Sequence, residues 1–275
     1  PGTNVIAVEV HQSATNSSDI VWGMALTAST QLQNCEPATV VLNEIFARNQ
    51  SFTNAAGRAP DWIELFNATT NTVDLSDFSL TDDAGALRKW VFPSGSSIGP
   101  LAHLVIECDN GVPASTTNTG FALGASGGAV FLVKRPADGG TVLDSLNFGF
   151  QAADYSLGRI EDGNGDWALT LPTRGAANVA ASLGNASSLK LNEWLASSPG
   201  EDDWLELFNP EPQPVALAGL ALTDDASVHD QSPLPPLSFI GPQRHQKLIA
   251  DGNRGAGADH VVADARHPHP LRPAG

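Results

Sequence analysis

The sequence contains one series of motifs twice, at a constant separation. Residues 61–67 (DWIELFN) return as residues 203–209 (DWLELFN). Residues 80–84 (LTDDA) return as residues 222–226, and both pairs are 142 residues apart. Repeats of roughly 20 to 50 residues form solenoids, whereas a period of this size is long enough for each copy to enclose its own core. The sequence therefore predicts tandem domains of one fold.

Composition limits the classes of protein to which the chain can belong. Its 26 Gly, 19 Pro and 41% hydrophobic residues are typical of a turn-rich globular chain. The formal net charge of −16, with 14 Lys and Arg, argues against a nucleic-acid partner, because phosphate binding needs clustered basic residues. We interpret the acidity as a means of solubility in a salty extracellular medium. No apolar run approaches the roughly 18 residues of a membrane span, so we expect no membrane insertion.

The start of the chain and its two cysteines give less information. Because the chain begins at Pro1 without an initiator Met, we expect it to be part of a longer protein whose targeting segment lies elsewhere. Cys35 and Cys108 form neither a disulfide framework nor a metal-ligand pattern. Whether they pair stays open; a bond between them would add on the order of 4 kcal/mol outside the cytosol.

Short apolar runs, broken about every 8 to 12 residues by Gly, Pro, Asn or Asp, predict an all-β sandwich or barrel. We expect residues 39–180 to form one complete domain of this class. The nine expected strands are residues 40–46, 62–67, 73–75, 78–80, 89–92, 101–107, 129–134, 142–148 and 168–171.

The remaining segments flank this domain. Residues 1–28 contain two β-rich runs, which we interpret as the closing strands of a preceding β-sandwich. Residues 29–38 and 181–188 are interpreted as linkers, and residues 189–275 as a second copy of the domain. After residue 251 the second copy departs from the first and has three prolines that a ladder strand would not tolerate. We therefore expect a truncated copy with exposed sheet edges.

Both copies carry acidic and amide side chains at equivalent positions. Such groups can bind Ca²⁺, act as an acid–base pair, or serve the scaffold as hydrogen-bond acceptors. They are Asn43, Glu44, Asp61, Glu64, Asp82 and Asp83, and in the second copy Asn192, Glu193, Asp203, Glu206, Asp224 and Asp225.

Strand alternation favours the scaffold interpretation. In residues 61–67, Trp62, Glu64 and Phe66 share one face of the expected strand. A carboxylate between two aromatic rings needs a partner, which a backbone N–H or the Asn43 amide can supply. Residues 81–85 are expected to form a turn in which Asp side chains accept hydrogen bonds from their own backbone two residues later.

One loop resembles the start of a calcium site. Asp162, Asn164 and Asp166 place oxygen ligands at alternate positions with glycine between them. The EF-hand pattern requires a Glu at its twelfth position and flanking helices, but that position is Thr173 and the flanks are β-type. We favour a hairpin turn and keep weak calcium binding as the alternative.

No pattern predicts catalysis. The seven histidines show no metal-ligand spacing, and only His103 and His245 correspond between the copies, which indicates a position in the fold. Nucleophile, phosphate-loop and dinucleotide motifs are absent from the sequence. We expect no catalytic residues and no cofactor, with calcium as the open exception.

These motifs together resemble the lamin tail domain, an immunoglobulin-like β-sandwich of nuclear lamins and of large secreted bacterial proteins. The resemblance is carried by residues 41–45, 61–67, 73–83, 90–93, 120–123 and 156–167, and in the second copy by about 65 residues. It implies one complete and one truncated copy. Two positions depart from the family pattern: Arg174 replaces a proline between Thr173 and Gly175, and residues 99–101 replace a Pro-Gly pair. Residues 1–12 also resemble the end of galactose-binding-like jelly-roll domains.

The resemblance implies non-enzymatic interaction or scaffolding modules of a large secreted or cell-surface bacterial protein. The expected partner is a protein or a cell-surface polysaccharide. The alternative is a carbohydrate-binding domain or an accessory domain of a secreted hydrolase. Carbohydrate binding would need an exposed aromatic platform, and we expect Trp62, Trp90, Trp167 and Trp204 to lie mostly in the core instead.

Overall fold

The computed structural model describes residues 39–196, 203–224, 227–229 and 231–249. Our predictions for residues 1–38, including Cys35 and the jelly-roll-like end, lie outside the described residues, and so do those for residues 250–275. Within the described ranges, no helix has the length and apolar character needed to cross a bilayer.

The first unit, residues 39–180, is built from strands and one short 3₁₀ turn, η1 (Pro136–Asp138). The strands are β1 (Val40–Phe46), β2 (Asp61–Asn67), β3 (Val73–Asp74), β4 (Ser79–Thr81), β5 (Trp90–Val91), β6 (Ser97–Ile98), β7 (His103–Cys108), β8 (Gly128–Val133), β9 (Val142–Phe148), β10 (Ser156–Arg159), β11 (Trp167–Leu171) and β12 (Val179–Ala180).

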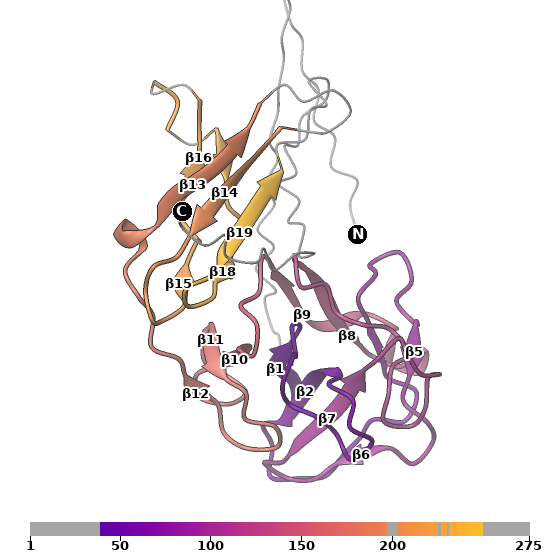
Figure 1. The fold of residues 1–275 in the computed structure, drawn as a ribbon. Coiled ribbons are helices and arrows are strands. Elements are labelled where there is room, and N and C mark those ends of the chain that lie inside the picture. The colour runs from indigo at the N-terminus through magenta and orange to yellow at the C-terminus, as the bar shows by residue number, and fades with distance from the viewer. Residues whose placement is uncertain (1–38, 197–202, 225–226, 230, 250–275) are drawn as a thin grey trace, which may run out of the picture.

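These strands form a two-layered β-sandwich, as predicted (Figure 1). One layer is a six-stranded sheet in the order β12-β11-β10-β1-β2-β7, and the other is a four-stranded sheet in the order β5-β4-β8-β9. β3 and β6 form a separate ribbon. Because β1 lies between β10 and β2 in the larger sheet, the last three strands of the unit, β10 to β12, are held beside the strand that opens it.

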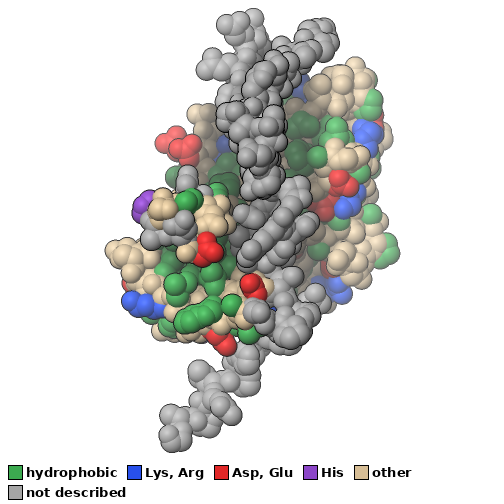
Figure 2. All heavy atoms as spheres, turned by 90° about the horizontal axis from the view of Figure 1, so that it is seen from above, with side chains coloured by type: hydrophobic (Ala, Val, Ile, Leu, Met, Phe, Trp, Pro, Cys, Tyr) green, Lys and Arg blue, Asp and Glu red, His purple; other side chains and the backbone are tan. Residues whose placement is uncertain are grey.

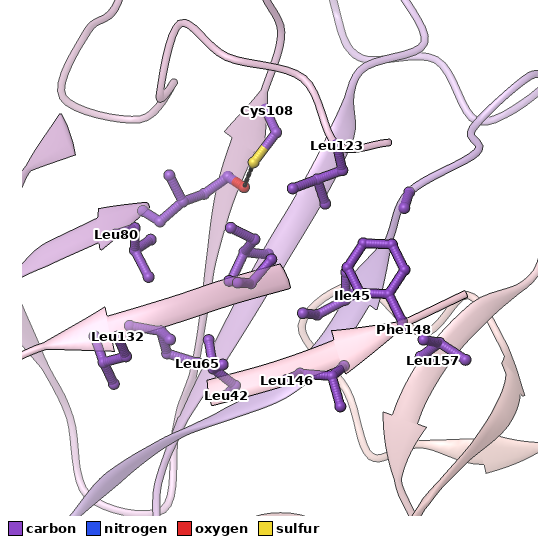
Figure 3. Packing of buried hydrophobic residues seen from close by; sticks show 14 of the residues in the cluster. Leu42, Ile45, Leu65, Leu80, Cys108, Leu123, Leu132, Leu146, Phe148 and Leu157 are labelled. Atoms are coloured by element: carbon purple, nitrogen blue, oxygen red, sulfur yellow. Dashed lines mark hydrogen bonds between the residues drawn. The ribbon is translucent and has the colours of Figure 1, made fainter. Parts of the chain in front are cut away.

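The core fills the space between the two sheets. Leu42, Ile45 and Leu65 of the larger sheet meet Leu132 and Leu146 of the smaller one, and all five are buried (Figure 3). Burying a side chain of this size stabilises the fold by about 1.5–3 kcal/mol relative to leaving it in water.

Cys108 lies in the same core as a free, buried thiol. Its Sγ lies 3.9 Å from the carbonyl oxygen of Ile106 (Figure 3). The burial of this thiol in apolar surroundings raises its pKa.

The nine predicted strands all correspond to strands of the first unit, and three further strands were missed. Of the missed strands, β6 and β12 are two residues long, whereas β10 (Ser156–Arg159) lies between β1 and β11. β10 has a single apolar side chain and a glycine, so it lacks the apolar run that the prediction relied on. Gly158 is needed there because a Cβ would lie 2.6 Å from the Asn178 side chain.

A β-bulge in β1 determines where its polar side chains point. The register against β2 shifts between Leu42 and Glu44, so Asn43 is an extra residue in the strand. As a result, both Asn43 and Glu44 face away from the core that contains Leu42. The backbone of Leu42 is satisfied by side chains instead: its N–H donates to Asp144 at 2.9 Å, and its carbonyl accepts from Arg159 at 2.9 Å.

The second unit comprises the strands from β13 onward, after the 3₁₀ turn η2 (Ala186–Ser188). Its central sheet has the order β13-β14-β19, and two ribbons pair β15 with β18 and β16 with β17. The strands are β13 (Lys190–Leu195), β14 (Trp204–Phe208), β15 (Val215–Ala216), β16 (Ala221–Leu222), β17 (Ser232–Pro233), β18 (Phe239–Ile240) and β19 (His245–Ile249).

The pairing of β13, β14 and β19 matches that of β1, β2 and β7. Even the bulge is present, because the register against β14 shifts between Leu191 and Glu193. A buried amide holds the following loop in each unit. The Asn67 amide donates to the carbonyls of residues 71, 98 and 99, and the Asn209 amide to those of residues 213, 240 and 241.

The two units are in direct contact. Phe150, which follows β9, is 1% exposed and belongs to the apolar cluster of the second unit. Backbone hydrogen bonds surround it, from Gly149 N–H to the Pro236 carbonyl at 3.0 Å and from Phe239 N–H to the Phe150 carbonyl at 2.7 Å. The first unit therefore supplies part of the core of the second.

Candidate functional site

Two carboxylates lie on the outer face of the larger sheet of the first unit. Glu44 of β1 and Glu64 of β2 are opposite each other in the strand pairing, and both are fully buried. The segment that closes the unit, residues 170–178, contributes groups that contact them. Because buried charges are costly unless they are hydrogen-bonded, the partners of these groups decide what the site can do.

Both oxygens of Glu44 accept hydrogen bonds from the protein. Oε1 accepts from the Ser156 hydroxyl at 2.6 Å and from the Thr173 N–H at 2.9 Å. Oε2 accepts from the Trp62 indole at 3.1 Å. The donors come from β10, from β2 and from the closing segment, so Glu44 joins three parts of the first unit.

Glu64 is held in the same way. Its Oε2 accepts from the Gly175 N–H at 2.6 Å, and its Oε1 accepts from the Asn43 amide at 3.2 Å. The prediction that a backbone N–H or the Asn43 amide would satisfy this carboxylate is confirmed. Burial still dominates, and it raises the pKa of Glu64 from 4.5 to about 7, with the nearby Glu44 acting in the same direction.

Asp162 points into this cluster. Its Oδ1 accepts from the Asn43 amide at 3.1 Å and from the Asn178 N–H at 3.2 Å. Its Oδ2 lies 3.0 Å from Nε2 of His103. Asn178 in turn donates to the carbonyls of Asn43 and Arg159, at 2.9 and 3.0 Å. The strand β1, the loop after β10 and the closing segment are thereby joined by one hydrogen-bond network.

Residues 161–165 form a turn between β10 and β11. The Gly165 N–H donates to the Glu161 carbonyl at 2.8 Å, and a Cβ at Gly165 would lie 1.3 Å from the Ile160 carbonyl oxygen. The tightness of the turn therefore accounts for this glycine. Among the described residues, no three His, Cys, Asp or Glu side chains, Asp162 and Asp166 included, lie close enough together to hold a metal ion.

The other acidic candidates of the first unit lie apart from this cluster. Asp61 accepts from the N–H groups of Asn49 and Leu123, and burial raises its pKa to about 6. Asp82 forms an ion pair with Lys89 at 2.6 Å. Asp83 accepts from the Gly85 N–H at 2.7 Å, which is the turn predicted for this segment.

In the second unit the equivalent side chains lie nearer the surface. The Asn192 amide donates to Glu206 at 2.7 Å, and Nδ1 of His245 lies 2.8 Å from the same carboxylate. His245 stacks on Phe208 as His103 packs on Phe66, which agrees with a role for both histidines in the fold. The remaining acidic candidates Glu193, Asp203 and Asp224 are exposed, and Asp225 lies outside the described residues.

Sequence reasoning missed most of the donors of this network. Ser156, Thr173 and Gly175 lie more than 100 residues after the carboxylates that they contact. Asn178 lies 135 residues after Asn43, to whose carbonyl it donates. The available signal was the closing Thr173-Arg174-Gly175 motif, which the resemblance singled out. Arg174, the departure from the family pattern, lies over the Trp62 ring at 5.5 Å and pairs with Glu107 at 2.8 Å.

The tryptophans follow the prediction in part. Trp62 and Trp90 are buried. Trp167 and Trp204 are half-buried, and each carries a cation over its ring, Arg159 at 4.8 Å and Lys247 at 4.6 Å. The outer face of the larger sheet therefore offers no exposed platform at Trp62.

Comparison with known proteins finds a family match over part of the chain. The family model of the Lamin Tail Domain matches residues 34–149. The match supports a lamin tail domain in this region. This is a family of non-catalytic immunoglobulin-like domains, and the described β-sandwich has that fold. No curated protein and no solved structure matches the chain. The match ends before β10, so Ser156, Asp162 and the closing segment lie beyond it.

Proposed function

We propose that the protein is a non-enzymatic interaction or spacing module of a larger secreted or cell-surface bacterial protein, with a protein as its partner. In this proposal the second unit is an incomplete copy of the lamin tail domain. The observation that carries the proposal is that the buried carboxylates are already hydrogen-bonded within the chain. All four oxygens of Glu44 and Glu64 accept hydrogen bonds from the chain itself.

Such a network suits a scaffold better than a reaction centre. A general acid or base must reach a substrate within hydrogen-bond distance, and both of these side chains are fully buried. The matched family is also non-catalytic. Export is supported by the acidic net charge of −16 and by the resemblance to modules of secreted bacterial proteins. A polysaccharide partner has less support, because Trp62 and Trp90 are buried and Trp194 is the one mostly exposed tryptophan among the described residues.

Turnover assays test this proposal. The whole chain, Glu64→Gln and the matched surface variant Glu161→Gln would be assayed against chromogenic esters, phosphoesters and glycosides, with and without calcium or zinc. We expect all three proteins to give rates equal to buffer. Turnover by the unsubstituted chain that Glu64→Gln abolishes and Glu161→Gln retains would overturn the proposal.

A further inference from the structure

The first strand of the second unit has an uncovered edge. In the first unit, β1 lies between β10 and β2, and all seven of its residues are buried. Its counterpart β13 pairs with β14 on one side, and five of its six residues are exposed. None of the described residues pairs with the other edge of β13. An unpaired edge of this kind offers a row of backbone donors and acceptors to an added strand.

Two of the exposed side chains of β13 are large and apolar. Leu191 is 68% exposed and Trp194 is 73% exposed, whereas their counterparts Leu42 and Ile45 are fully buried in the first unit. Hydrophobic side chains are visible at the surface on both sides of the molecule in Figure 2. Large apolar side chains that are exposed near one another are a mark of interaction sites.

The outer face of β13 also carries acceptors like those of β1. Glu193 occupies the position of Glu44, next to the same register shift. In the first unit, Ser156 of β10 and the backbone of Thr173 donate to Glu44. Equivalent donors are not among the described residues of the second unit. Among the described residues, the edge therefore has acceptors like those of β1, and the donors that satisfy them in the first unit have no described counterpart.

The geometry points to a partner, and we propose that β13 accepts an antiparallel strand of the β10 type from another polypeptide. The pairing of β10 with β1 in the first unit indicates which residues this added strand should have. There Gly158 lies opposite Glu44 and Leu157 opposite Ile45, so the added strand would place a glycine opposite Glu193 and an apolar side chain opposite Trp194. A hydroxyl two residues before the glycine would donate to Glu193, as the Ser156 hydroxyl donates to Glu44.

The remaining donor is an arginine. In the first unit, Arg159 directly follows the glycine and donates to the carbonyl of Leu42, which the bulge leaves unpaired. The matching carbonyl in the second unit belongs to Leu191. Strand addition of this kind derives its affinity from main-chain hydrogen bonds and its specificity from alternate side chains. A second copy of β13 fits less well, because it would bring another carboxylate where a donor is needed. This inference deepens the proposed interaction role and rests on it.

Peptide binding tests the inference. The probe is a synthetic peptide of residues 153–180 of this chain, which contains β10 and the donors that follow it. The matched control is the same peptide with Leu157→Pro, which removes a backbone N–H on the side of β10 that faces β1. Titrated into the whole chain, the probe should bind and shift Trp194 emission to the blue, and the Trp194→Phe chain should lack that shift. We expect Leu191→Asp, a change at an exposed position, to weaken binding by about tenfold or more.

Each other outcome counts against the inference. It is overturned if the peptide fails to bind, or if Leu191→Asp binds it as well as the unsubstituted chain. Dimers that Leu191→Asp abolishes would show that a second copy occupies the edge. A blue shift of Trp194 with soluble oligosaccharides would show a glycan site instead. If the peptide fails to bind and the chain shows no turnover, the inference is wrong and the proposed function still holds. Turnover that depends on Glu64 refutes the proposed function whether or not the peptide binds.

Discussion

The buried Glu64 should make the stability of the first unit depend on pH in a direction that is unusual for a carboxylate. Burial raises its pKa from 4.5 to about 7 in the folded chain, so over this range the folded state binds more protons than the unfolded state. The stability from Glu64 is therefore fully present below about pH 4.5 and is lost as the pH rises through about 7. At about 1.4 kcal/mol for each pH unit, the full loss is about 3 kcal/mol.

Substitution by glutamine isolates this effect. Glu64→Gln keeps the shape of the side chain and removes its charge, so its free energy of unfolding should fall much less between about pH 4.5 and pH 7. Asp61, whose pKa burial raises to about 6, contributes a similar loss at lower pH. Asp61→Asn should therefore flatten the lower part of the profile and Glu64→Gln the upper part.

The assay is urea unfolding of the whole chain, followed by tryptophan fluorescence at a series of pH values. The exposed Glu161→Gln variant serves as the control and should follow the unsubstituted profile. If the Glu64→Gln profile runs parallel to the unsubstituted one from pH 5 to 8, the carboxylate does not titrate as its burial requires. The buried carboxylate cluster would then not control the pH dependence of stability.

Three further predictions follow from single contacts. Asn178→Ala removes the donor to two carbonyls and should lower the free energy of unfolding by about 1–3 kcal/mol in urea titrations. The exposed Asn110→Ala is the neutral control, and equal free energies of unfolding for the two variants would contradict this prediction. Gly149→Ala places a Cβ 1.9 Å from the Ser238 hydroxyl oxygen, so hydrogen exchange of β15 and β18 should quicken while β1 keeps its protection. In a Cys35→Ser chain the buried Cys108 thiol should react with a disulfide reagent only after unfolding, and rapid reaction of the native chain would refute its burial.

Local patterns in the sequence predicted the parts of the fold that depend on local physics. β1 and β9 have the bounds expected from their apolar runs, because the pattern that predicts a strand lies in consecutive residues of the sequence. The hydrogen bond from Asn43 to Glu64 could also be predicted from the sequence, because the two residues lie on adjacent strands and face the same side of the sheet. The strand β10 was missed because Gly158 and its polar neighbours carry no apolar run. Only its place between β1 and β11 makes it a strand.

The rest of the candidate site depends on contacts between distant residues. Nothing near Glu44 in sequence indicates that Ser156 and Thr173 would satisfy it, because the closing segment reaches it through tertiary structure. The loop of Asp162 was predicted as a turn, but its inward direction follows from Asn43, which the β1 bulge places there. The contact of Phe150 with the second unit also had no local signal.

Calorimetric unfolding of the whole chain, with and without millimolar calcium, tests the central claim most directly. Glu44, Glu64 and Asp162 accept hydrogen bonds from donors of the chain itself. The unfolding temperature should therefore be the same in both conditions. A clear rise with calcium would mean that the folded state binds the ion, by linkage of binding to folding. A rise that the Asp162→Asn variant removes would contradict the account at its centre.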